Sequence, residues 1–432
     1  MSLRHRVRVI VSESSCRGHR VTGPSCYAWP VPRLSPFAGV RYAAPGGRLD
    51  DLVAPPYDVI NPAQAAALAG RSEHNAVLLE LPQDELDRDR YAVAAARWSE
   101  WRRSGVLADD PEPGLYVYRM GFHDPDGRPR QTTGVIGALE LSEPAEGRIL
   151  PHEHTTPKDK ADRLSILRAC RANLSPIWAL SPAAGLGALC EPAGPPDARA
   201  TDEDGVHHRL WRVTAPGVVD AIGEVVASAP VIVADGHHRF ETALAYRDER
   251  RAAGGAAGAP SESVMAYVVE LSDEQLLVQP IHRLLSRLPA GFDLPAALAP
   301  HFEVQEMNGQ PGGGPAMVAA MTRAGALGLV VPSGSYLLRP TPATEAAAGA
   351  DLDSSRLAVA LADLPEHVLT FQHGADTVTD LVRAGRADAA VLLRPATVDQ
   401  IAATGRGGAR MPPKTTFFAP KLRTGMVFRD IA

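Results

Sequence analysis

Residues 230–251 have the sequence PVIVADGHHRFETALAYRDERR, and this stretch decides which fold class we expect. The apolar run 230–234 predicts a short buried strand, and the pattern over 240–251 predicts a helix that ends before Gly254-Gly255. Five polar residues, 235–239, join the two elements. A strand, a tight turn and a helix in immediate succession favour a mixed, α+β fold.

The turn Asp235-Gly236-His237-His238-Arg239 has the composition of an anion-binding site. The first turn of a helix offers backbone N–H donors and the positive end of the helix dipole, and both favour bound phosphate. Gly236 lets a ligand approach the backbone, while the two histidines and the arginine supply donors for phosphate oxygens. Asp235 caps the helix or holds a metal ion. The simpler alternative is an ordinary N-cap aspartate followed by surface histidines.

Outward from this turn, hydrophobic periodicity predicts helices and strands on both sides. The predicted helices are 62–69, 87–104, 159–173, 218–228, 354–361 and 377–384. The predicted strands are 115–122 and 131–141, around a hairpin turn at 124–127, and then 174–180, 208–213, 264–271, 276–282 and 389–393. We therefore expect an extension at 1–33, a β-rich module at 34–150, a central unit at 151–285 and an α/β section at 286–432, of which 286–350 gives only weak signals.

The composition is that of a folded globular chain with a mildly acidic charge. Hydrophobic residues make up 45% and charged residues 22% of the 432 residues. A formal net charge of −6 and only 5% aromatic residues argue against broad binding to nucleic acid. No apolar run is long enough to span a membrane, and the four cysteines form no CxxC pair, which favours a reducing, cytoplasmic compartment.

Residues 1–33 differ from the rest, with six arginines and one acidic residue but no apolar segment typical of secretion signals. We predict a disordered extension here. A transit-like peptide and a start codon placed too early are the alternatives.

The lysines are few and clustered. The 44 basic residues include only four lysines, which lie in two short segments: Lys158, Lys160, Lys414 and Lys421. Because arginine replaces lysine easily on solvated surfaces but not at point-charge sites, the clustering indicates that both segments need ammonium groups.

The first lysine pair follows Pro151-His152-Glu153-His154-Thr155. Glu153, a carboxylate flanked by potential cations, is a candidate general base for an incoming hydroxyl. The HxH spacing of His152 and His154 also suits a transition metal, with His237 and His238 as further ligands. A solvated charged loop is the third reading of this segment.

The second lysine pair lies in the segment 412–422, which mixes lysines with hydroxyls and aromatic residues. This segment either closes over an anionic ligand or forms an edge strand with solvated lysines. Tyr57-Asp58 and His282-Arg283 are weaker candidates for a site. The sequence has no GxxxxGK[ST] phosphate loop, so a Walker-type fold is excluded.

Five separated segments, in order, resemble the bacterial and archaeal domain-of-unknown-function family 1015, from about residue 34 to the end. These segments are Pro55–Ile60, Leu150–Thr155, Asn173–Ile177, Ala234–Leu244 and Pro412–Val427. Within them, Pro151-His152-Glu153 and the turn at 235–239 are similar to the signature of free serine kinases of the ParB/sulfiredoxin-like superfamily. This second resemblance covers about a third of the chain.

The resemblance implies a ParB/sulfiredoxin-like central unit that phosphorylates free L-serine with ADP or ATP. Glu153 then stands in the place of the base, and the turn at 235–239 in the place of the phosphate-holding loop. Two features differ from a minimal serine kinase. The glutamate is followed by His154-Thr155, and the flanking sections exceed a minimal serine kinase.

We therefore predict a phosphotransferase that acts on a small, serine-like hydroxyl compound. Glu153, His237 and Arg239 are the predicted catalytic residues, Mg²⁺ is expected near Asp235, and Lys158 and Lys160 add positive charge. Lys414 and Lys421 are expected to close over the ligand. The alternative is a nucleotide-binding switch or scaffold without turnover. The sequence leaves homo-oligomerisation open.

Overall fold

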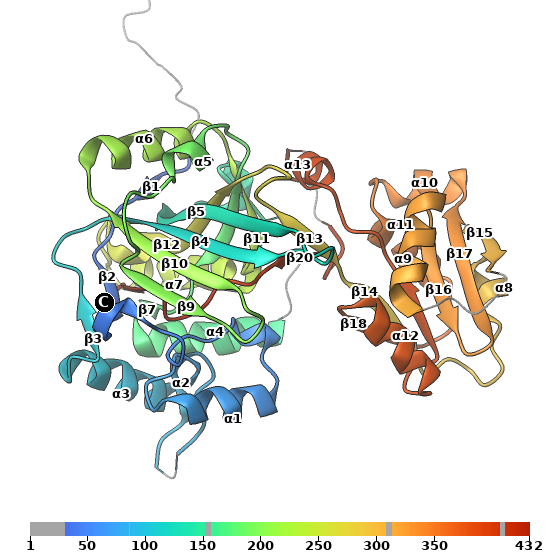
Figure 1. The fold of residues 1–432 in the computed structure, drawn as a ribbon, viewed down its shortest axis with the longest axis horizontal. Helices are drawn as coiled ribbons and strands as arrows, with labels where there is room; N and C mark the ends of the chain where they lie inside the picture. The colour runs from blue at the N-terminus through green and yellow to red at the C-terminus, as the bar shows by residue number, and fades with distance from the viewer. Residues whose placement is uncertain (1–30, 86, 152–156, 308–312, 407–410) are drawn as a thin grey trace, which may run out of the picture.

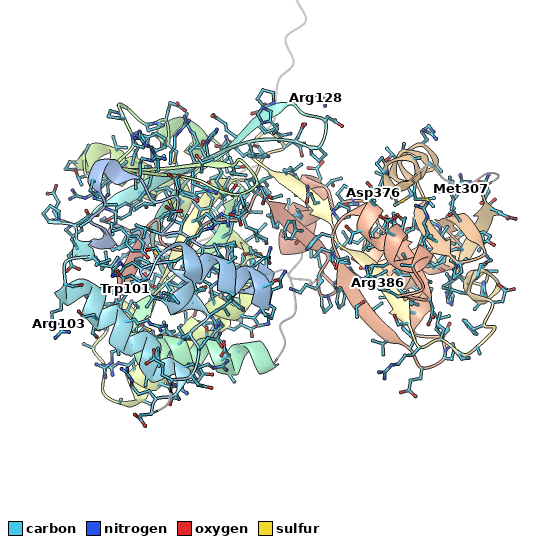
Figure 2. All side chains as sticks on the ribbon, turned by 60° about the horizontal axis from the view of Figure 1, so that its bottom comes forward. Trp101, Arg103, Arg128, Met307, Asp376 and Arg386 are labelled. Carbon is cyan, nitrogen blue, oxygen red and sulfur yellow. The ribbon has the colours of Figure 1, made fainter. Side chains whose placement is uncertain are left out.

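The computed structural model describes residues 31–85, 87–151, 157–307, 313–406 and 411–432. Two bodies lie side by side, a larger one built around a nine-stranded sheet and a smaller one built around a six-stranded sheet (Figure 1). Figure 2 shows the same separation from another side, with Trp101 in the larger body and Asp376 and Arg386 in the smaller one. None of the described helices is long and apolar enough to cross a bilayer.

The nine-stranded sheet has the order β6-β11-β8-β12-β5-β4-β10-β9, and β1 adds to β5. Two pairs in it, β6 with β11 and β8 with β12, are parallel, and the others are antiparallel. Its strands are β1 (Leu34–Ser35), β4 (Leu115–His123), β5 (Pro129–Glu140), β6 (Ile149–Pro151), β8 (Ile177–Ser181), β9 (Ala198–Thr201), β10 (His207–Val213), β11 (Val231–Asp235) and β12 (Ser263–Glu270).

Both faces of this sheet are covered, which explains why strands such as β11 and β12 are apolar almost throughout. Alternate side chains of one strand enter two different cores, as Met265 and Val264 of β12 do. The first core also contains α1 (Pro62–Arg71), α2 (Val77–Glu80), α3 (Arg90–Arg103) and α4 (Pro157–Cys170). The second contains α5 (Leu186–Leu189), α6 (Pro216–Ala227) and the start of α7 (His237–Ala252).

Local sequence signals fix several of these elements. Helix α1 starts at a capping box, in which Asn61 accepts from the Gln64 amide and the Gln64 side chain accepts from the Asn61 amide. The β4–β5 hairpin turns where Asp124 accepts from the amides of Asp126 and Arg128. The predicted strands and helices from 62 to 285 therefore occur close to their expected positions.

The smaller body contains β15, β17, β16, β19, β14 and β18 in that order. These are β14 (His282–Ser286), β15 (Phe302–Glu306), β16 (Leu327–Val331), β17 (Gly334–Pro340), β18 (Val368–Gln372) and β19 (Ala389–Leu392). The helices of the smaller body are α8 (Leu294–Leu298), α9 (Gly313–Ala324), α10 (Pro342–Ala348), α11 (Asp353–Leu361) and α12 (Ala375–Arg383), whereas α13 (Val398–Arg406) packs into the first core of the larger body through Ile401. Much of this structure lies in 286–350, where hydrophobic periodicity is weak.

The last residues of the chain return to the larger body. Strand β20 (Thr416–Ala419) pairs with β13 (Leu277–Pro280). Strand β21 (Phe428–Asp430) lies between β2 (Gly39–Tyr42) and β7 (Ala172–Asn173) in a four-stranded sheet whose outer strands are β3 (Leu107–Asp109) and β7. The return places residues 411–432 against the turn that follows β11.

The expected section boundaries do not coincide with breaks in hydrogen bonding. Strand β5 of the expected module 34–150 pairs with β12 of the expected unit 151–285, so both contribute to one sheet. The expected section 286–432 is divided as well, because β20 and β21 pair with strands of the larger body. These are pairings between distant residues, which local sequence patterns do not indicate.

Candidate functional site

The turn between β11 and α7 requires glycine at position 236. Gly236 has φ +84°, and a Cβ placed there would lie 2.9 Å from Arg239 Nε. The register of β11 against β8 shifts between Val233 and Asp235, so a bulge lies next to the turn. Helix α7 then starts at His237 and directs its first-turn backbone N–H groups toward the turn.

Asp235 is held between two cations. The Nζ of Lys421 lies 2.6 Å from Asp235 Oδ1, and a terminal nitrogen of Arg239 lies 3.2 Å from Oδ2. Burial would raise the pKa of Asp235, but the charges of Lys421 and Arg239 outweigh it and hold the pKa well below its usual range. Asp235 is therefore an ionised link between the turn and the C-terminal segment.

Arg239 reaches back toward the protein as well as toward Asp235. It donates to Ser175 Oγ at 2.9 Å and to the Pro176 carbonyl at 2.6 Å. Its Nε is buried without a hydrogen-bond partner among the described residues. The predicted phosphate contact of Arg239 stays a prediction, and in this structure its guanidinium ties the turn to the segment before β8.

Lys414 and Lys421 reach the same turn from the C-terminal segment. Lys414 is exposed and has φ +58°, a conformation that costs energy for a residue with a side chain. The buried Arg283 fixes this conformation, because its guanidinium donates to the carbonyls of Pro413 and Lys414 at 3.1 and 2.9 Å. Arg283, a weaker candidate for a site by sequence, therefore holds the backbone of the C-terminal segment in place.

These groups line one cavity of about 390 Å³, within the size range of small-molecule sites. Its wall contains a cationic side, the first turn of α7 and several aromatic rings. The lining residues are Tyr57, Asp58, Val59, Ala234, Asp235, Gly236, His237, His238, Arg239, Ile281, Phe371, His373, Lys414, Thr416, Phe417 and Lys421. The two bodies both contribute, since Phe371 lies on β18 of the smaller body and the turn belongs to the larger one.

One ring in the wall is closely packed between charged and aromatic neighbours. The ring centroids of His373 and Phe417 lie 3.9 Å apart, and Lys421 Nζ lies 4.4 Å from the Phe417 centroid. Burial, followed by the charges of Lys421 and Lys414, lowers the pKa of His373 to about 4. His373 is therefore neutral at neutral pH, and the net positive charge of the wall comes from the lysines.

Other predicted residues lie elsewhere or outside the described residues. Lys160 forms an ion pair with Glu241 on α7 and does not line the cavity. Lys158 belongs to α4. The candidate base Glu153 and the HxH pair of His152 and His154 fall in 152–156, outside the described residues.

The donor set at the turn does not fit a protein-held Mg²⁺ at Asp235. Both carboxylate oxygens of Asp235 already bond to cationic groups, whereas Mg²⁺ needs free oxygen ligands. Within the described ranges, no group of three or more His, Cys, Asp or Glu residues is placed to hold a metal ion. The expectation of a metal at Asp235 is therefore not supported by the geometry.

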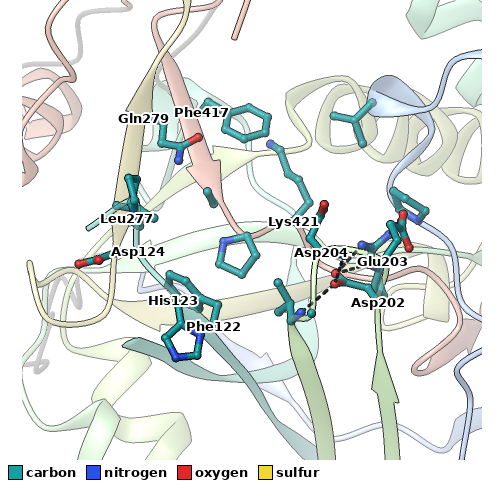
Figure 3. A pocket seen from close by; sticks show the side chains of 18 of the residues that line it. Phe122, His123, Asp124, Asp202, Glu203, Asp204, Leu277, Gln279, Phe417 and Lys421 are labelled. Carbon is teal, nitrogen blue, oxygen red and sulfur yellow. Dashed lines mark hydrogen bonds and ion pairs between the residues drawn. The ribbon is translucent and has the colours of Figure 1, made fainter. Parts of the chain in front are cut away.

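A second cavity of about 500 Å³ adjoins the first and shares Val59, Phe417 and Lys421 with it (Figure 3). Acidic side chains line its other side. Asp202 is buried between His208 and Arg423, which hold its pKa well below the usual range against the effect of burial, while Asp204 is exposed. Lys421 therefore stands between a cation-rich cavity and an acid-lined one.

Sequence reasoning missed the aromatic part of the site. Phe371 and His373 lie in a region where only neighbouring helices were predicted, and nothing in their local sequence marks a site. Phe417 belongs to the predicted C-terminal segment, but its packing against His373 depends on a pairing across more than forty residues.

Residues 34–358 match the model of the family described as "Protein of unknown function (DUF1015)". The match covers more than half of the chain, so the chain belongs to this family. The matched region ends before the segment 412–427, to which we had extended the resemblance. A search of curated proteins finds no match.

Solved structures show a distant likeness. The chain is similar to a free serine kinase in complex with AMP, at 13% identity and a TM-score of 0.34, over 63% of this chain and 84% of that chain. A variant of the free serine kinase in complex with ADP gives 12% identity and a TM-score of 0.36 over the same shares. SbnI with a C-terminal truncation, from Staphylococcus aureus, gives 12% identity and a TM-score of 0.36, over 67% of this chain and 85% of that chain. No residue role follows from likenesses this distant.

Proposed function

We propose that this protein is a small-molecule phosphotransferase that moves a phosphoryl group from a nucleotide to a hydroxyl, with free L-serine as the leading acceptor. The observation that carries the proposal is the convergence of Lys414, Lys421 and the first turn of α7 on one cavity. Point charges and backbone N–H donors are the groups that hold phosphates in proteins. Phosphoryl transfer needs mainly such positioning and charge neutralisation.

The nucleotide's terminal phosphates would lie at the turn, against Lys414 and the amides that follow Gly236. Lys421 would contact them while it keeps its bond to Asp235. Arg239 would act indirectly, because its hydrogen bonds hold the turn in shape. Any Mg²⁺ would arrive with the nucleotide and be held by phosphate oxygens and water, as is usual for this ion.

The acceptor would enter through the adjoining acid-lined cavity, on the other side of Lys421. The exposed carboxylate of Asp204 would attract the ammonium group of an amino acid, which supports a serine-like acceptor over a neutral alcohol. Both cavities then deliver their ligands to the same lysine.

Glu153 would accept the proton of the attacking hydroxyl. The hydroxyl oxygen of the acceptor attacks the terminal phosphorus of the nucleotide. The bond from that phosphorus to the bridging oxygen breaks, and AMP leaves from ADP or ADP leaves from ATP. This role rests on the sequence: Glu153 follows by two residues Pro151, the last residue of β6, which pairs with β11 in parallel.

The test combines product analysis with one variant. The purified chain, incubated with ATP or ADP and a pool of small hydroxyl compounds that includes L-serine, should yield a phosphorylated product by mass spectrometry. Glu153→Gln should lower turnover about 10²- to 10⁴-fold and leave nucleotide affinity nearly unchanged. Nucleotide binding without any product would favour the switch or scaffold reading, and equal loss of binding and turnover in the variant would exclude Glu153 as the base.

A further inference from the structure

Phe371 is one of the few large hydrophobic side chains that the described residues leave exposed. It lies on β18, is 41% exposed, and lines the cation-rich cavity together with the turn after β11. An exposed aromatic ring in a cavity wall offers a flat apolar face that a ligand can cover. Phe371 lies beyond residue 358, where the family match ends.

Arg283 packs against the Phe371 ring and limits its movement. The guanidinium carbon of Arg283 lies 4.7 Å from the ring centroid. Arg283 itself is buried and bonded to the carbonyls of Ile281, Pro413 and Lys414. A ring that is backed by an immobilised cation is preorganised for a flat partner on the side that faces the cavity.

The other phenylalanine of the cavity does not offer the same surface. Phe417 has His373 at 3.9 Å between centroids and the Lys421 ammonium at 4.4 Å from its ring centroid. Two side chains therefore already contact this ring, whereas the Phe371 ring is 41% exposed. Among the described lining residues, Phe371 combines an exposed ring with a position in the phosphate-binding cavity.

We propose that Phe371 is the stacking surface for the base of the bound nucleotide, whose phosphates extend to Lys414 and to the turn at Gly236. The inference rests on the proposed function and adds to it that the nucleoside diphosphate or triphosphate is held at both ends, by its base and by its phosphates. It also assigns a role to the smaller body, whose edge strand β18 supplies the base subsite. A nucleotide then bridges the two bodies.

Two ligands separate the base from the phosphates. ADP carries both, whereas inorganic pyrophosphate carries only the phosphates. Calorimetric titration of the full chain and of Phe371→Ala with each ligand should show ADP binding weakened about 5- to 100-fold, from the loss of one stacking contact. Pyrophosphate binding should be unchanged. Phe371→Tyr should keep ADP affinity, because tyrosine offers the same flat ring.

Val368 provides the matched control. It lies on the same strand and is 38% exposed, but it does not line the cavity, so Val368→Ala should alter neither ligand. Unchanged ADP affinity in Phe371→Ala, or equal weakening for both ligands, would overturn the base subsite. A wild-type chain that binds pyrophosphate but not ADP would overturn it while the phosphate site stands. A chain that binds neither would overturn the proposed function as well.

Discussion

Replacing Lys421 with methionine removes the ammonium from the Asp235 ion pair and keeps most of the aliphatic side chain. The side chains of Lys421 and Asp235 are only 11% and 17% exposed, and the two atoms lie 2.6 Å apart. Breaking a fully buried pair costs about 3–5 kcal/mol, and hydrogen bonds to charged groups contribute about 1.5–3 kcal/mol. Because Arg239 still neutralises Asp235 in part, we expect Lys421→Met to lower the free energy of unfolding by about 2–3 kcal/mol.

Lys160→Met is the matched control, since it makes the same chemical change in a more exposed pair. Lys160 and Glu241 are 39% and 20% exposed, and pairs of this kind contribute about 0.2–1 kcal/mol. Urea unfolding is best followed by tryptophan fluorescence, because the described tryptophans all belong to the larger body: Trp98, Trp101, Trp178 and Trp211. Equal destabilisation by the two substitutions would show that the Lys421–Asp235 pair contributes no more than an exposed ion pair.

The same pair predicts a dependence on pH. The pKa of Asp235 is lower in the folded chain than in the unfolded chain, so its contribution to stability is complete above the unfolded pKa of about 4. That contribution is lost as the pH falls toward the folded pKa. Lys421→Met raises the pKa of Asp235 in the folded chain. The difference in free energy of unfolding between wild type and variant should therefore narrow as the pH falls from 6 to 3.5. A constant gap over that range would show that ionised Asp235 is not its source.

Three further predictions follow from charges and patterns elsewhere in the chain. Asp202→Asn should destabilise the fold by about 3 kcal/mol in urea titrations, because it removes the buried carboxylate that pairs with the buried Arg423 and leaves only the exposed Glu203, whereas exposed Asp204→Asn should change stability by less than about 0.5 kcal/mol. Pyrophosphate binding should raise the pKa of His373 above about 4, since the phosphates offset the lysine charges that lower it, and an NMR titration of the imidazole would detect the change. Deletion of residues 2–30 should leave the thermal midpoint unchanged in calorimetry, because their sequence has no core-forming pattern, and a clear drop would show that they pack.

Local signals in the sequence were sufficient for much of the larger body. The apolar run before Asp235 and the helix that follows Gly236 occur as β11 and α7, because a buried strand and an amphipathic helix each have a distinct periodicity. The region 286–350 gave weak signals because alanine, glycine and proline dominate it, yet it forms strands such as β16 and β17 that tertiary packing stabilises.

The candidate site was predictable only in its local parts. The composition of the turn and the clustered lysines indicated an anion site, and Lys421 does contact Asp235 across 186 residues. The other lysine cluster was less informative, since Lys160 pairs with Glu241. Phe371 had no sequence signal, because its role depends on how β18 is placed against the larger body.

The most direct test of the account is a calorimetric titration of the full chain and of Lys414→Met with ADP. Lys414 is exposed, lines the cavity and has no carboxylate partner among the described residues, so its replacement should not disturb the fold. We expect wild type to bind ADP and the variant to bind it about 10- to 100-fold more weakly, because one charge-assisted phosphate contact is lost. Equal affinity in the two proteins, or no binding of ADP or ATP by the wild type, would contradict the claim that this cavity holds nucleotide phosphates.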